Sequence, residues 1–271
     1  MIYLFAAMQC ELEPFVAQYS LTSINDAAGS IYSGENIVAA VTGVGKVNAA
    51  FMVSRVLALY PPDLESVIVN VGVAGGVFDA AGDPGGAGVF LINDIYDIDT
   101  DKHYYPDMIY DLGLPERGLK TSSVVVSSIS DNYLYDMEAS AVFSVASKFV
   151  SPERIFVIKT ISDSGADSNK VTPDFVKSLM SGVVPVVDKI IDAFPSVDHD
   201  DFAAVLADFY AEQLYCSEYM RNELSGLVHF AVTLGLAPGE IMADIAGDFS
   251  EITCRKQGKE VLDEFRRRLT T

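Results

Sequence analysis

Two carboxylates stand where an α/β protein can use them for acid–base chemistry. In the stretch YDMEASAVFSVASKFVSPERIFVIKTISD, residues 135–163, Glu138 lies at the start of an alanine-rich helical segment and Asp163 at the end of an apolar run. Ligands of open α/β sheets bind at the carboxyl ends of strands, so Asp163 is well placed to meet a substrate. Glu138 equally suits a residue that stabilises a helix dipole, and Asp163 an ordinary turn residue. The spacing alone leaves both interpretations open.

The elements that position this pair are predicted from hydrophobic periodicity. Apolar residues recur every three to four positions over 139–149, which predicts a helix that Ser151-Pro152 ends, and the β-branched run 155–161 predicts a buried strand. The same criteria predict strands over 2–7, 31–33, 37–41, 66–71, 89–92 and 124–127, and helices over 11–18, 47–60 and 173–194, the last kinked or split at Pro185. Strands and helices that alternate in this way indicate the α/β class.

Two glycine-rich segments follow predicted strands, Thr42-Gly43-Val44-Gly45-Lys46 and Gly72-Val73-Ala74-Gly75-Gly76. The first is neither a P-loop, because Val47 replaces the required Ser or Thr, nor a dinucleotide fingerprint, because Asn48 replaces the third glycine. It remains a strand-to-helix turn whose backbone N–H groups can approach a small polar ligand. The second segment lets the backbone pass close to a flat ligand, and a plain tight turn is its alternative.

Together these motifs resemble the nucleoside phosphorylase and nucleosidase superfamily, and within it the methylthioadenosine/S-adenosylhomocysteine nucleosidases. The resemblance rests on Met137-Glu138-Ala139, on the strand end Ile161-Ser162-Asp163, on the two glycine segments, and on Ala7-Met8-Gln9-Cys10-Glu11, which is similar to the family's Ala-Met-x-x-Glu. It spans about residues 1–194 and stops there. It implies a three-layer α/β sandwich with a central mixed, twisted sheet as a catalytic domain over 1–195, and an all-helical extension over 196–271.

The resemblance also implies an activity, hydrolysis of the N-glycosidic bond of a purine nucleoside without a metal or organic cofactor. Asp163, oriented by Ser162, would protonate the departing base, and Glu11 would activate the water. Glu138 would bind the ribose hydroxyls, with Met137 under the sugar ring. Further substrate contacts are implied in the glycine segments, at Gly43, Gly72, Ala74 and Gly75. The loop after residue 92 would help to enclose the 5′ substituent, in the family often across the boundary of a homodimer, and its candidates are His103 and Tyr105, for which packing within the loop is the alternative.

Two alternatives remain open from the sequence. Phosphorylases of the superfamily hold phosphate with arginines, whereas the arginines before the tail are Arg55, Arg117 and Arg154, none of them at a glycine segment, so hydrolysis is favoured. A non-catalytic nucleoside sensor is suggested by the short linker before residue 135, where the nucleosidases carry an aromatic residue that stacks on adenine. Tyr133 or Tyr135 would have to supply a substitute stacking surface.

Composition excludes several classes of function. A formal net charge of -20 and a pI near 4.3 argue against a nucleic-acid partner, because phosphate binding depends on Lys and Arg. No apolar run reaches the ~18–20 residues that span a bilayer, and the first residues lack the basic start of a signal peptide. The scattered thiols of Cys10, Cys216 and Cys254 indicate neither disulfides nor a zinc site, and we expect a cytoplasmic protein.

An acidic loop, NDIYDIDTDKHYYPDM over 93–108, has aspartates in the spacing that opens a calcium loop. Lys102 takes the place of the required glycine and Met108 that of the terminal glutamate, so calcium binding is excluded.

The tail after the polar linker at 196–201 lies outside the resemblance. Amphipathic patterns predict four helices, over 202–215, 218–234, 238–246 and 256–269. They carry no assignable chemistry, and His229 on an apolar face is expected to be a core histidine. We expect the tail to be a docking or oligomer-supporting module.

Overall fold

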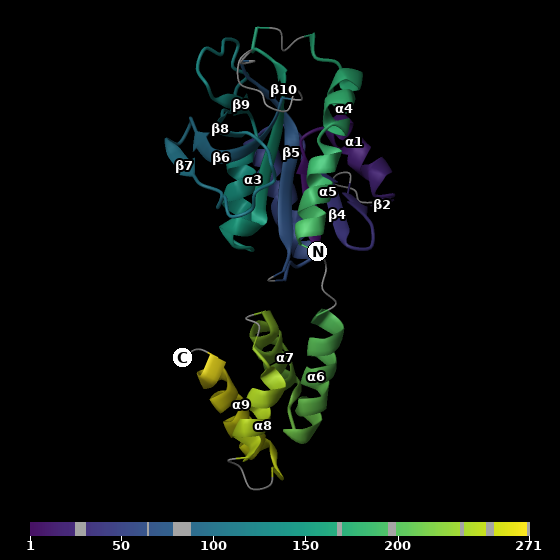
Figure 1. Ribbon diagram of the computed structural model, residues 1–271, viewed down its shortest axis with the longest axis vertical. Helices are drawn as coiled ribbons and strands as arrows, with labels where there is room; N and C mark the ends of the chain where they lie inside the picture. The colour runs from purple at the N-terminus through teal and green to yellow at the C-terminus, as the bar shows by residue number, and fades with distance from the viewer. Residues whose placement is uncertain are drawn as a thin grey trace. The chain divides into compact units, whose positions relative to one another are not determined.

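The computed structural model describes residues 1–24, 31–63, 65–77, 88–166, 170–194, 199–233, 236–247 and 252–269. The chain divides into two compact units, Met1–Pro195 and Ser196–Thr271 (Figure 1). Part of the predicted linker, residues 196–198, lies outside the described residues. Within the described ranges, no helix has both the length and the apolar character needed to cross a membrane.

A mixed sheet forms the centre of the first unit. Its strands are β1 (Ile2–Ala6), β2 (Thr22–Ile24), β3 (Ile31–Ser33), β4 (Ile37–Val41), β5 (Val67–Gly75), β6 (Val89–Asp97), β7 (Lys102–Tyr104), β8 (Glu116–Thr121), β9 (Leu134–Asp136) and β10 (Ile155–Asp163). The central strands β4, β1, β5 and β10 run parallel in that order, so their carboxyl ends meet at one edge. Because β5 also pairs with β9, a closed circuit of pairings runs through β5, β10, β6, β8 and β9.

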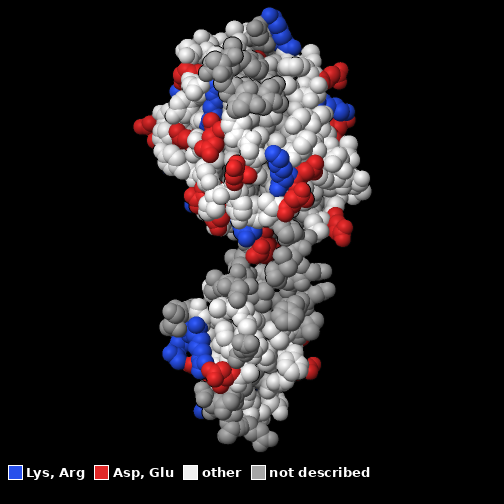
Figure 2. All heavy atoms as spheres, viewed as in Figure 1, with Lys and Arg blue, Asp and Glu red and all other residues white. Residues whose placement is uncertain are grey.

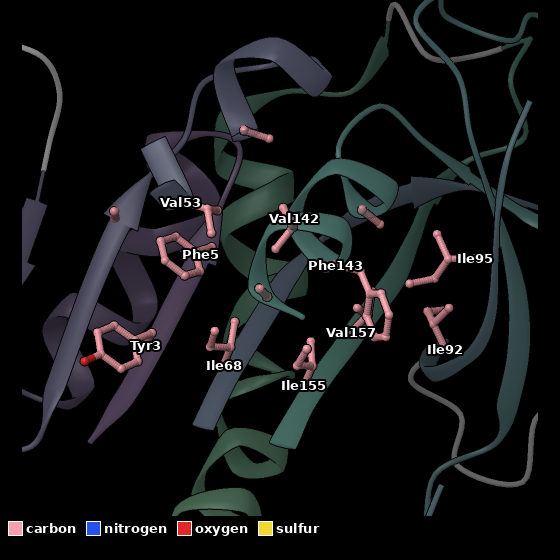
Figure 3. Close-up of a cluster of buried hydrophobic side chains, with 14 of the residues drawn as sticks. Tyr3, Phe5, Val53, Ile68, Ile92, Ile95, Val142, Phe143, Ile155 and Val157 are labelled. Carbon is pink, nitrogen blue, oxygen red and sulfur yellow. The ribbon is translucent and has the colours of Figure 1, made fainter. Parts of the chain in front are cut away.

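Helices cover both faces of the sheet (Figure 1). Alternate residues of each buried strand point to opposite faces, so Phe5 and Val157 face the helices α2 (Lys46–Leu59) and α3 (Ala139–Ala146) (Figure 3). Their neighbours Leu4 and Ile158 face α1 (Gln9–Gln18), α4 (Pro173–Ser181) and α5 (Val184–Ala193). The predicted three-layer α/β sandwich with a mixed sheet is confirmed.

Most of the predicted elements of this unit are present, with two differences around the pocket described below. The predicted strand 124–127 is wrong, because Val124 and Val125 are exposed and pair with no described strand. The strands β8 and β9 were not predicted, since β8 is largely polar and buries only alternate residues. The predicted helix 173–194 is split into α4 and α5 close to Pro185, as expected.

The second unit consists, in its described ranges, of α6 (His199–Gln213), α7 (Glu218–Thr233), α8 (Pro238–Gly247) and α9 (Arg255–Leu269), close to the predicted helices. Residues such as Leu224, Leu262 and Phe265 give it a hydrophobic core of its own. Lys and Arg side chains gather on one side of this unit (Figure 2). The three arginines that end α9 pair with carboxylates of the same unit: Arg266 with Glu223, Arg267 with Glu264, and Arg268 with Asp244 and Glu264. They stabilise the unit internally.

Candidate active site

A pocket of about 210 Å³ opens at the carboxyl ends of β1, β5 and β10. Carboxylates from three distant segments line it, namely Glu11, Glu138 and Asp163. The pocket lining also contains four more of the predicted site residues, which are Ala74, Gly75, Met137 and Ser162. The sheet explains this convergence. Glu11 follows β1 and Asp163 ends β10, two parallel strands whose carboxyl ends meet at one edge, and Glu138 follows β9, which pairs antiparallel with the end of β5.

Glu11 lies in the first turn of α1 and is buried, with 2% of its surface exposed. Its Oε1 accepts the N–H of Val73 at 2.8 Å and its Oε2 accepts the N–H of Met8 at 2.8 Å. Burial raises the pKa of Glu11, although the charge of Lys159 acts in the opposite direction. A Cβ atom at Gly72 would lie 2.9 Å from Oε1 of Glu11, so Gly72 makes room for this carboxylate and is not itself in the pocket lining.

Glu138 precedes α3 at its N-cap position, and its Oε1 accepts the N–H of Gly45 at 2.7 Å. Gly45 has a φ of 95°, a conformation that favours glycine. The predicted contact residue Gly43 lies outside the lining and donates its N–H to the carbonyl of Ala7 at 3.1 Å. The first glycine segment therefore supports the site through Gly45, which holds Glu138, while Gly43 anchors the turn to the end of β1.

Asp163 ends β10, and hydrogen bonds fix both oxygens of its carboxylate. The hydroxyl of Ser162 donates to Oδ2 at 2.8 Å and the N–H of Gly165 donates to Oδ1 at 2.7 Å. A β-bulge between Ile161 and Asp163 shifts the strand register at this point. Such bulges re-aim a side chain at the end of a strand, and here Ser162 and Asp163 both line the pocket.

A buried lysine, Lys159, lies beside the carboxylates, and it is not among the site residues predicted from the sequence. Nζ of Lys159, in β10, lies 3.0 Å from Oδ2 of Asp136, and both side chains are almost fully buried. Burial acts to lower the pKa of Lys159, but the charges of Asp136, Glu138 and Glu11 outweigh it and raise the pKa. Asp136 is also held by the hydroxyl of Thr121 and the N–H of Ala139. The signal in the sequence was a lysine inside the apolar run IFVIKTI, because a lysine is seldom buried without a partner.

The outer wall of the pocket is apolar and comes from the irregular segment after β8. Val124, Val125, Val126 and Ile129 all line the pocket. A Cβ atom at Gly75 would lie 2.7 Å from the side chain of Ile129, so the glycine allows this segment to approach β5. This segment therefore contributes branched aliphatic side chains to the pocket lining.

The tyrosines and the histidine predicted near the pocket have different positions. Tyr135 lines the pocket, whereas the hydroxyl of Tyr133 donates to Asp94 at 3.2 Å and Tyr133 is not in the lining. His103 also contacts Asp94, at 2.7 Å, and stacks on Tyr96 and Tyr105. Neither His103 nor Tyr105 belongs to the described pocket of this single chain. No group of His, Cys, Asp or Glu in the described ranges is arranged to hold a metal ion.

The carboxyl of Glu138 makes the stability of the unit depend on pH. Burial, with the nearby charge of Asp136 second, raises the pKa of Glu138 from 4.5 to about 7. Between these values the folded protein keeps a proton that the unfolded chain has lost, so the stability falls as the pH rises through this window. We expect Glu138→Gln to flatten this fall, which amounts to about 3 kcal/mol. Urea unfolding of both proteins at a series of pH values measures it, and parallel curves would contradict the assignment.

No protein-family model matches the chain. The chain is similar to a 5′-methylthioadenosine/S-adenosylhomocysteine nucleosidase of Lysinibacillus sphaericus, with 27% identity over 233 residues that cover 70% of this chain and 98% of the relative.

Solved structures give the same result for the fold. A variant of the Helicobacter pylori nucleosidase MTAN with 5′-methylthioadenosine in its active site matches with a TM-score of 0.59 and 16% identity, over 71% of this chain and 98% of that chain. The S-adenosylhomocysteine nucleosidase of Streptococcus pyogenes in complex with 5-methylthiotubericidin matches with a TM-score of 0.60 and 18% identity, over 72% and 97% of the two chains. The predicted resemblance to this superfamily is confirmed, and part of this chain has no counterpart in these proteins.

Proposed function

We propose that this chain, a nucleosidase-like member of the nucleoside phosphorylase and nucleosidase superfamily, hydrolyses the N-glycosidic bond of a purine nucleoside of the methylthioadenosine/S-adenosylhomocysteine type. The products are the free base and a ribosyl sugar. The observation that supports this most is the convergence of Glu11, Glu138 and Asp163 on one pocket of about 210 Å³.

Each carboxylate has a distinct part in the proposed reaction. Asp163, held by Ser162 and Gly165, delivers a proton to the imidazole-ring nitrogen of the departing purine. Glu138 binds the ribose hydroxyls and stabilises the positive charge that develops on the sugar. Glu11 removes a proton from the attacking water, and its raised pKa makes it a stronger base than an ordinary glutamate. The bond from water oxygen to the anomeric carbon forms as the bond to the base breaks.

Lys159 supports these roles from behind the pocket. Its positive charge offsets those of Glu11, Glu138 and Asp136, which otherwise would repel one another in a buried space. Because Lys159 lowers the pKa values of Glu11 and Glu138, it keeps both closer to the ionised form that their proposed roles require.

Water is favoured over phosphate as the nucleophile. The described pocket lining contains no Arg or Lys that could hold a phosphate. Arg117 binds Asn132 and Arg154 binds Glu65, both away from the pocket. The buried Glu11 carboxylate would also repel a phosphate anion at the position from which the nucleophile attacks.

Product analysis tests the proposal. Purified protein is incubated with methylthioadenosine, adenosylhomocysteine, adenosine or inosine, each with and without phosphate. We expect free base and free ribosyl sugar, released at the same rate without phosphate. Ribose 1-phosphate formed only with phosphate would assign the chain to the phosphorylases, and nucleoside binding without any base release would favour the sensor.

We further propose that the chain acts in the cytoplasm as a homodimer and binds no nucleic acid. Apolar side chains exposed on α2 next to the pocket, Val47 and Phe51, support a subunit contact there, and Val44 reaches from the same segment into the pocket lining. The partner's copy of the loop that carries His103 and Tyr105 would then complete the substrate site. Sedimentation of a monomer at assay concentrations would reject the dimer.

A further inference from the structure

Two motifs that the sequence analysis left without a role of their own in the chemistry meet in the structure. Asp97 opens the calcium-like loop at the end of β6, and Lys46 is both the last residue of the first glycine segment and the first residue of α2. Nζ of Lys46 lies 2.9 Å from Oδ1 and 3.0 Å from Oδ2 of Asp97. Asp99 adds a second carboxylate 2.6 Å from the same Nζ. The acidic loop therefore binds a cation that belongs to the chain itself.

Asp97 contacts a second helix as well. The hydroxyl of Ser140, in the first turn of α3, donates to Oδ2 of Asp97 at 2.7 Å. The N–H groups of Asp99 and Thr100 donate to Oδ1 at 3.1 Å each and fix the orientation of the carboxylate. Asp97 is 5% exposed, and a buried carboxylate with this many partners is held rigidly. One side chain thus ties the first residue of α2 to the first turn of α3.

These two helix starts are the parts of the chain that hold Glu138. Glu138 is the residue before α3, two positions from Ser140, and Gly45, which donates its N–H to Glu138 at 2.7 Å, is the residue before Lys46. Asp97 is therefore linked to the donor of that hydrogen bond through Lys46, the residue after Gly45. It is linked to the acceptor through Ser140, two residues after Glu138. Asp97 itself is not in the pocket lining.

We infer that Asp97, bridging Lys46 and Ser140, is a positioning residue that holds the Glu138 carboxylate in place for the ribose hydroxyls. The inference rests on the proposed function, because it takes Glu138 as the ribose-binding group. Without the bridge, α2 and α3 can separate, and the Gly45 hydrogen bond to Glu138 lengthens. Small displacements of a group that contacts substrate reduce catalytic efficiency strongly.

Asp97→Asn is the first test, because asparagine keeps the size of the side chain and removes its charge. We expect kcat/KM for methylthioadenosine to fall by about tenfold or more, with KM raised and kcat lowered, because Glu138 both binds the ribose hydroxyls and stabilises the charge that develops on the sugar. Ser140→Ala breaks only the contact to α3 and is expected to change KM in the same direction by a smaller factor. Asp63→Asn is the matched control, since Asp63 also accepts two hydrogen bonds, from Ser66 and Glu65, before β5. It should leave kcat/KM unchanged.

A double-variant cycle separates positioning from general support of the fold. In a Glu138→Gln background the group that Asp97 positions has lost its charge, so Asp97→Asn should lower kcat/KM by clearly less than it does alone. An equal fall in both backgrounds, or an unchanged kcat/KM in folded Asp97→Asn, overturns the inference and leaves the proposed function standing. Absence of base release by the unmodified protein overturns the proposed function. The affinity for methylthioadenosine is then measured by calorimetry in Asp163→Asn and in the double variant that also carries Asp97→Asn. A tenfold weaker affinity in the double variant supports the inference, and an equal affinity rejects it.

Discussion

Replacing Asp163 by asparagine is expected to remove nearly all release of free base, lowering kcat by roughly 10²–10⁴-fold, the usual contribution of a general acid. Asparagine is close in shape, and its amide can keep the local contacts, with Oδ1 accepting the N–H of Gly165 and Nδ2 donating to Ser162. It has no proton that it can transfer to a leaving purine. The loss should therefore appear in the chemical step while the folded structure is preserved.

Three measurements make this expectation specific. Base release is followed under saturating methylthioadenosine, the thermal transition reports the fold, and calorimetry reports nucleoside binding. Asp188→Asn is a matched control, because Asp188 lies in α5, accepts the hydroxyl of Tyr19 at 2.9 Å and is not in the pocket lining. Turnover within about tenfold of the unmodified protein in Asp163→Asn would remove Asp163 from the role of general acid.

The positions of the candidate site residues could be predicted where local pattern and topology agree. Glu11, Glu138 and Asp163 each lie at a strand end or a helix start that hydrophobic periodicity predicts. Parallel pairing of β1, β5 and β10 then brings Glu11 and Asp163 together, and the antiparallel pairing of β9 with the end of β5 brings Glu138 to the same place. The alternation of apolar strands with helices predicted the α/β class, whereas the three-layer sandwich with a mixed sheet was implied by the family resemblance.

The remaining features depend on contacts that no local pattern carries. Lys159 in β10 and Asp136 at the end of β9 form a buried ion pair, and their two strands both pair with β5. The sequence contains no local pattern that identifies either residue as the partner of the other. Gly45 supports Glu138 where Gly43 was predicted to contact substrate, because a choice between neighbouring glycines depends on the backbone angles of the turn. Val124 looks like a strand residue by propensity but lies in the pocket wall.

Lys159→Met should strongly destabilise the folded protein. Methionine keeps much of the apolar stem of the side chain and removes the charge that faces Asp136, Glu11 and Glu138. Removing one partner of a buried ion pair leaves the other uncompensated and costs about 3–5 kcal/mol of the free energy of unfolding. Urea unfolding at neutral pH measures this loss. Lys159→Arg is the matched control, since it keeps the cation, and it should retain more of the stability than methionine does.

The pH dependence of this loss identifies its cause. Lys159 lowers the pKa values of Glu11 and Glu138, so these pKa values rise further in Lys159→Met. As the pH falls, the carboxyls take up protons, the uncompensated negative charge disappears, and the difference in stability between the two proteins should shrink. A cavity or a packing defect would instead destabilise the variant equally at all pH values. A difference that stays constant between about pH 5 and 8 would therefore show that Lys159 stabilises the fold by packing, and that the three carboxylates do not depend on its charge.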